Sequence, residues 1–147
     1  MASMIKNKKA QGFTLVELAV VVVIIGVLAA FAVPRFLKSV ERSKAAEAFN
    51  YLSSVNSAQE RYHARNGIYA DEVDDLDVKM PTPEYFTVGT FAVPTGETDF
   101  ETGWELTLTR TGSSAGYGNY TVTFDHNGYN AGESNISNDI SPLQSSS

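Results

Sequence analysis

The chain has 147 residues, no cysteine and a formal net charge of −6, so it is long enough for one small core and has neither disulfides nor thiol chemistry. Its charge is unevenly spread, because beyond Gly67 the sequence holds thirteen acids against two bases, Lys79 and Arg110. This acidic distal part is a poor match for the phosphate backbone, so we predict no direct binding of nucleic acid. A basic proximal part joined to an acidic distal part suits association between copies of one chain; the alternative is that each part is simply a solvated surface.

The chain begins with a short basic stretch followed by a long apolar run. Residues 13–33 are almost entirely apolar, and as a helix they would be about 31 Å long, close to the hydrocarbon core of a bilayer at about 30 Å. One carboxylate, Glu17, lies near the start of this run. A charged side chain at the centre of a span costs about 2.5–3.5 kcal/mol, and less near an end. Two readings of Glu17 remain open: favourable interaction with the helix N-terminus, or pairing with a charge on another chain. The basic residues before the run are Lys6, Lys8 and Lys9.

The stretch KNKKAQGFTLVELAVVVVIIGVLAA resembles the class III signal of type IV prepilins and their pseudopilin relatives. The resemblance covers a basic leader, Gly12, Phe13, Glu17 and the apolar run. It implies that residues 1–12 are a leader, removed by a prepilin peptidase that cuts between Gly12 and Phe13 and N-methylates the Phe13 amine. It also implies that Glu17 of one subunit pairs with this amine on the next, which sets the register of a homo-polymer built through its N-terminal helices.

An ordinary signal peptide is the alternative reading of the same stretch. Ala30 and Ala32 form a passable signal-peptidase site, which would release a soluble secreted binding domain beginning near Val33. However, the apolar run is longer than the usual core of about 7–15 residues, and Glu17 would be unusual inside such a core.

The apolar run predicts a membrane or filament-core helix over 13–34, with Gly26 and Pro34 as weak points where it can kink or unwind. The resemblance implies that this stretch extends inside a filament. Apolar residues at helical spacing then predict an amphipathic helix over 35–67, with a stop at Asn66-Gly67. The predicted core-facing stripe comprises Phe36, Leu37, Val40, Lys44, Ala45, Ala48, Phe49, Leu52, Val55, Gln59 and Tyr62.

Residues 68–147 predict a globular β domain that begins with an acidic loop and ends in a polar tail. Strands are expected over 85–93, 103–111 and 119–125, where apolar and polar residues alternate. Three or four antiparallel strands with one apolar face need a cover, which the helix over 35–66 supplies. The predicted fold class is therefore α+β, with a long N-terminal helix packed on a small antiparallel sheet, similar to a type IV pilin. Many pilins close their last loop with a disulfide; here the tail, with Asp125 or Asn127, would hold that edge, although it is expected to be mobile or loosely held.

Few residues offer site chemistry. With only His63 and His126, a catalytic triad or a zinc site is poorly provided, so we predict no enzyme and no cofactor. No calcium loop of the EF-hand pattern is present, although the resemblance implies that calcium can bind near the C-terminus, as in pseudopilins of the major type. Two triplets fit a glycosylation acceptor, at Asn119 and Asn135. The calcium candidates are Asp125, Asn127, Glu133 and Asp139.

The predicted function is that of a structural subunit of a type IV pilus-like filament. Its precursor is expected in the inner membrane and its polymer as an extracellular or periplasmic filament, served by a prepilin peptidase and a pilus or secretion assembly machinery. Adhesion, surface motility and protein secretion follow from the resemblance alone. A pseudopilin of a type II secretion system is the alternative within the same family.

Overall fold

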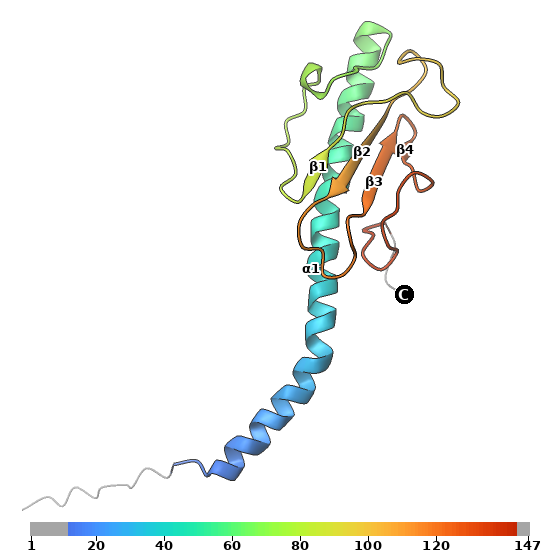
Figure 1. Cartoon of the computed structure of the whole chain (residues 1–147). Helices are drawn as coiled ribbons and strands as arrows, with labels where there is room; N and C mark the ends of the chain where they lie inside the picture. The colour runs from blue at the N-terminus through green and yellow to red at the C-terminus, as the bar shows by residue number, and fades with distance from the viewer. Residues whose placement is uncertain (1–11, 144–147) are drawn as a thin grey trace, which may run out of the picture. The chain divides into compact units, whose positions relative to one another are not determined.

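The structure, a computed structural model, describes residues 12–143 and divides into two compact units, Met1–Phe36 and Leu37–Ser147. One helix, α1 (Leu15–Asn66), begins in the first unit and ends in the second (Figure 1). Of the predicted leader, residues 1–12, only Gly12 lies among the described residues. The three leading lysines, Lys6, Lys8 and Lys9, therefore lie outside the described part of the chain.

Within the first unit α1 buries none of its side chains. Every residue from Gly12 to Phe36 is exposed, and the hydropathy of this stretch is high enough for a membrane span by length and composition alone. The helix is continuous through Gly26 and Pro34, so the single chain shows no unwound residue there. The predicted extension of this stretch inside a filament stays a prediction.

Four antiparallel strands form the sheet of the second unit. They are β1 (Phe86–Val88), β2 (Glu105–Arg110), β3 (Thr121–Asp125) and β4 (Gly128–Tyr129), in the spatial order β1-β2-β3-β4. Figure 1 shows them side by side along the second half of α1. The sheet and the helix confirm the predicted α+β class.

The core of the second unit lies between α1 and one face of the sheet. Strand β2 alternates buried and half-buried residues along its whole length, and Trp104 just before it is completely buried, as the period-2 pattern predicts. The aromatic rings interlock at near-perpendicular angles, with Phe91 and Trp104 5.5 Å apart and Phe49 and Phe124 5.8 Å apart between centroids. The helix contributes Ala45, Ala48, Phe49, Tyr51, Leu52, Val55 and Ala58 to this core.

The predicted stripe on the helix is wrong at its N-terminal end. Phe36 and Leu37 are 67% and 43% exposed, whereas the buried residues begin at Glu41. Helical spacing identifies the face of a helix but gives no information on how far along it a sheet extends. The predicted stop is confirmed, because α1 ends at Asn66 and Gly67 takes a left-handed φ of 77°, with its N–H donating to the His63 carbonyl at 2.8 Å.

The first predicted strand, residues 85–93, is wrong as a continuous strand. It consists of β1 and, further on, a single bridge between Ala92 and Glu105. Val88 pairs with Leu108 and Ala92 pairs with Glu105. Between these two pairs, three residues (89–91) stand opposite two residues of β2 (106–107), which is a β-bulge. A Cβ at Gly89 would lie 2.8 Å from the Thr107 carbonyl oxygen, so the bulge needs glycine at this close approach.

The predicted loose tail is also wrong for its described part. Ile136 and Ile140 are 9% and 0% exposed. Strand β4 pairs with only two residues of β3, Phe124 and Asp125, and polar groups of the tail cover the rest of that edge. The Thr121 N–H donates to Asn135 Oδ1 at 2.5 Å and the Thr123 N–H donates to Ser134 Oγ at 2.9 Å. These side chains meet the hydrogen-bonding needs of an otherwise open edge.

Candidate functional site

The residues around the predicted cleavage point precede the first turn of α1. Gly12, Phe13 and Thr14 have no regular secondary structure, and Phe13 is 82% exposed. The peptide bond between Gly12 and Phe13 is therefore outside the helix and open to another protein. This geometry agrees with a processing site.

Glu17 lies in the first turn and makes two reciprocal hydrogen bonds with Thr14. The Thr14 N–H donates to Glu17 Oε2 at 2.8 Å, and the Glu17 N–H donates to Thr14 Oγ1 at 3.2 Å. The Thr14 hydroxyl also donates to the same carboxylate oxygen at 2.8 Å. This arrangement is a capping box, which satisfies backbone N–H groups that the first turn leaves unpaired. The spacing Thr-x-x-Glu is the sequence signal of a capping box, and it went unused in predicting the role of Glu17.

Only one oxygen of this carboxylate is used by the capping box. Glu17 Oε1 has no hydrogen bond to any residue between 12 and 143. The local role and a role toward a second chain are therefore compatible, because one oxygen can hold the cap while the other accepts a donor from outside.

The apolar surface that follows the capping box is uninterrupted over several turns. A shallow groove of about 320 Å³ is lined entirely by apolar side chains: Leu15, Val16, Ala19, Val20, Val23 and Ile24. An unburied apolar surface of this size requires lipid or another apolar surface around it.

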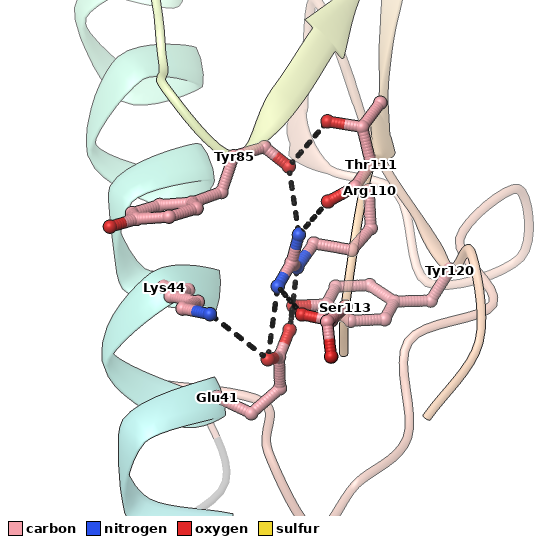
Figure 2. A network of polar contacts seen from close by, with 7 residues as sticks. All are labelled: Glu41, Lys44, Tyr85, Arg110, Thr111, Ser113 and Tyr120. Atoms are coloured by element: carbon pink, nitrogen blue, oxygen red, sulfur yellow. Dashed lines mark hydrogen bonds and ion pairs between the residues drawn. The ribbon is translucent and has the colours of Figure 1, made fainter. Parts of the chain in front are cut away.

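A second candidate region is a buried charge network between α1 and the sheet (Figure 2). Glu41 and Arg110 are each 1% exposed. Arg110 Nε donates to Glu41 Oε1 at 2.6 Å and Nη2 donates to Oε2 at 3.1 Å, which is the bidentate geometry of a strong ion pair. The Tyr120 hydroxyl donates to Glu41 Oε1 at 2.9 Å, and Lys44 Nζ lies 3.9 Å from Oε2.

The remaining donors of the Arg110 guanidinium bind main-chain carbonyls. Nη1 donates to the carbonyls of Tyr85 and Thr111, and Nη2 donates to the carbonyl of Ser113 at 2.6 Å. Together with the two bonds to Glu41, these contacts use all five N–H donors of the side chain. The network therefore joins the helix, the start of β1 and the end of β2 at one point.

Burial and pairing act in opposite directions on Glu41. Burial by itself raises the pKa of this carboxyl, but the hydrogen bonds from Arg110 and Tyr120 and the charges of Arg110 and Lys44 outweigh burial, so the pKa is lowered. Burial, followed by the hydrogen bond to Glu41, raises the pKa of Tyr120. Glu41 is thus ionised and Tyr120 neutral at ordinary pH, and every group is held by partners. The network positions elements and presents no free acid or base for chemistry.

This network was missed in the sequence, although a signal for it was present. Arg110 is in phase with Trp104, Leu106 and Leu108 on the inward face of the strand, and Glu41 precedes Ala45 by one helical turn. An acid and a base that both occupy core positions of neighbouring elements point to a buried ion pair.

Three of the four calcium candidates lie around one polar pocket. Asp125, Asn127 and Glu133 line it, together with Glu105, whereas Asp139 does not and instead pairs with Lys38 at 3.1 Å. Burial and the charges of Glu133 and Asp125 raise the pKa of Glu105. Among the described residues no group of three or more His, Cys, Asp or Glu side chains has the arrangement of a metal site.

Comparison with known proteins points to the N-terminal segment. The family model "Prokaryotic N-terminal methylation motif" matches residues 7–33. The chain is 41% identical over 70 residues to the type IV major pilin protein PilA of Myxococcus xanthus. It is 48% identical over 76 residues to the type IV narrow pilus major component PilA5 of Thermus thermophilus. It is also 35% identical over 78 residues to the type II secretion system core protein G of Vibrio cholerae.

These matches are partial in length. The match to PilA covers 48% of this chain and 32% of PilA. The match to PilA5 covers 52% of this chain and 62% of PilA5, and the match to core protein G covers 53% of each. Among solved structures, a type IV pilin from Shewanella oneidensis is 23% identical, with a TM-score of 0.47, and covers 66% of this chain and 97% of its own.

Proposed function

We propose that the chain, which is similar to type IV pilins and to type II secretion pseudopilins, is a structural subunit of a type IV pilus-like filament. The observation that carries this proposal is the first unit, whose helix exposes its apolar side chains on every face. Such a helix is stable in lipid or among other apolar helices. In this proposal the helix spans the inner membrane before assembly and packs against helices of other copies in the filament core.

The leader is proposed to be removed before assembly. A prepilin peptidase cuts between Gly12 and Phe13 and N-methylates Phe13, so that residues 13–34 become the membrane and filament-core helix. The match to the methylation motif and the exposed, non-helical backbone at the cut support this step. Residues 35–67 and 68–147 then form the parts outside the membrane.

Glu17 is proposed to set the register between adjacent subunits. Cleavage creates a cationic amine at Phe13, and an isolated charge is costly in apolar surroundings. Oε1 of Glu17 can accept a hydrogen bond from that amine of a neighbouring subunit, while Oε2 accepts the hydrogen bonds of the capping box. Two buried charges are tolerated when each has the other as its partner. Gly26 and Pro34 are proposed as the points where the helix extends inside the polymer.

The test of this proposal is the substitution Glu17→Gln. The leader should still be removed and Phe13 methylated, as shown by mass spectrometry of the N-terminus. The yield of sheared filaments should fall at least about tenfold, since one partner of a buried pair is lost. Glu101→Gln removes the same charge from an exposed site and is the matched control. Normal processing together with a wild-type yield for Glu17→Gln would exclude the pairing.

A pseudopilin of a type II secretion system is the second candidate. It is supported by the similarity to the core protein G of Vibrio cholerae, which extends over as much of this chain as the similarity to pilus components. The similarities do not separate the two functions, because the relatives are of both kinds. Electron microscopy of the cell surface separates them: long surface filaments identify a pilin, and a short periplasmic polymer a pseudopilin.

The alternative from another class is a secreted binding domain behind an ordinary signal peptide. It is compatible with the second unit having its own core and with the apolar helix lying near the N-terminus. N-terminal mass spectrometry decides the question, because this alternative gives a mature chain that starts at Val33 instead of Phe13.

A further inference from the structure

A pocket of about 320 Å³ opens between three segments of the second unit: the middle of α1, the acidic loop that follows it, and the β-bulge after β1. Its buried part is apolar and includes Tyr51 and Phe91, which are 4% and 8% exposed. Its exposed part carries three carboxylates, those of Asp71, Glu72 and Asp74. None of the side chains that line it is basic.

The acids of this pocket have no compensating charge within the described part of the chain. Arg61, on the same helix as Tyr51, is already bound to Asp77, with Nη2 2.8 Å from Oδ1. In contrast, the carboxylates of Asp71, Glu72 and Asp74 form no hydrogen bond or ion pair with any residue of the range 12–143. Three uncompensated carboxylates around one opening create a negative potential that attracts a cation.

Tyr51 adds a second, independent observation. Its side chain lines the pocket and is almost completely buried, while its hydroxyl oxygen keeps some exposure and forms no hydrogen bond with a described residue. Burial, and secondly the charge of Asp74, raise the pKa of this hydroxyl, so it is neutral and its oxygen can accept a hydrogen bond from a donor in the pocket.

The apolar lining indicates which kind of cation fits. A hydrated metal ion needs several oxygen ligands around one point, and no such group is found among the described residues. An ammonium or guanidinium group on an apolar stem fits better, because its stem packs on Val73 and Phe91 while its head meets the carboxylates.

We propose that this pocket binds the basic side chain of a second copy of the chain. This inference rests on the proposed function, which brings many copies into contact. The chain provides suitable side chains, since Arg35 and Lys79 are exposed and form no ion pair with a described residue. The pocket would thus link the acidic loop of one subunit to a basic residue of its neighbour, outside the apolar helix.

The chemistry of the pocket is tested first, without a polymer. The full chain in detergent micelles is titrated with n-butylammonium while NMR signals of Tyr51, Val73 and Phe91 are recorded. Saturable shifts are expected with n-butylammonium and absent with n-butanol or butyrate. The double variant Asp71→Asn/Asp74→Asn should bind about fivefold more weakly, as expected for lost ion pairs. The control Glu84→Gln/Glu101→Gln, which changes the charge equally outside the pocket, should bind as wild type. No saturable shift with n-butylammonium would overturn the inference.

The second copy is tested in cells that assemble the chain. Asp74→Lys should lower the yield of sheared filaments about fivefold, because one attraction becomes a repulsion, while Glu101→Lys should not. Adding Arg35→Glu or Lys79→Glu to Asp74→Lys should restore assembly. Unchanged yield for Asp74→Lys, or rescue by neither second change, would exclude a second copy as the occupant.

The two arms separate this inference from the proposed function. Filaments made by the wild-type chain, together with no binding of n-butylammonium, would overturn the pocket and leave the function standing. A wild-type chain that binds n-butylammonium and never polymerises would overturn the function and the second copy with it.

Discussion

At the scale of single residues, the contact between Arg110 and Glu41 is the most demanding feature of the chain. Two opposite charges are almost completely removed from water, and each depends on the other, since an unpaired buried charge costs several kcal/mol. A buried pair of this kind contributes little net stability compared with apolar residues. Removing one partner nevertheless strongly destabilises the protein, because the other charge is left buried and unpaired. We therefore expect the pair to act mainly on specificity, by favouring one alignment of helix and sheet.

This reasoning predicts a strong asymmetry between single and multiple substitutions. Arg110→Met should lower the free energy of unfolding by about 3–5 kcal/mol, because Glu41 is left charged and buried. The triple variant Glu41→Leu/Arg110→Met/Tyr120→Phe should recover most of that loss. Urea unfolding of the full chain in detergent micelles measures the free energy of unfolding of both variants. A triple variant as unstable as Arg110→Met would show that the network itself supplies the stability.

A second prediction at this scale concerns the first turn of α1. Thr14→Ala removes one side of the capping box and should lower the stability of the first helical turn by about 1 kcal/mol. Hydrogen exchange of the Glu17 and Leu18 amides should then be about fivefold faster. Thr14→Ser keeps the hydroxyl and is the matched control. Equal exchange in Thr14→Ala and wild type would mean that the capping box does not hold the first turn in solution.

At the scale of elements, the C-terminal segment takes the place of a fifth strand. It covers the part of β3 that β4 leaves open, and it attaches to the core through two isoleucines. An edge strand with unpaired N–H and C=O groups would favour pairing with other chains. In a chain that is proposed to polymerise through its helix, a covered edge limits association to the intended surface.

The segment should therefore contribute to global stability. Ile140 is completely buried, whereas Leu143, three residues later, is 61% exposed. Ile140→Ala should lower the free energy of unfolding by about 2–4 kcal/mol, and Leu143→Ala should change it by less than about 0.5 kcal/mol. Urea unfolding of the full chain compares the two variants. Similar small effects for both would indicate a segment that is not part of the folded core.

At the scale of the whole molecule, acid should destabilise the chain through Glu41. Its pKa is lowered on folding from an ordinary value of 4.5, so the folded chain binds fewer protons than the unfolded chain over this range. The contribution of Glu41 to the free energy of unfolding is present above about pH 4.5 and is lost as the pH falls through and below that value. The free energy of unfolding of the full chain in micelles, measured at roughly pH 7 and pH 3.5, should fall less in Glu41→Gln than in wild type. An equal fall in both would assign the acid sensitivity to other carboxyls.

The sequence alone determined the features that depend on local chemistry. The apolar stretch with its basic leader and single acid can be recognised from the residues themselves, because lipid compatibility depends on composition and length. Strands β2 and β3 follow from alternation, and the end of α1 follows from Asn66-Gly67. The N-terminal motif indicates the family by itself, since its residues are adjacent along the chain.

Only the tertiary structure decided the features that join residues far apart along the chain. Glu41 and Arg110 are separated by 69 positions, and nothing local to either residue names its partner. The interruption of the first strand at Gly89 depends on the approach of Thr107 from β2. The order of the tail depends on an open edge of β3 that its residues happen to fit. Local sequence sets what each segment can be, whereas packing sets which polar groups and apolar surfaces meet, because burial and pairing energies exist only once the segments are brought together.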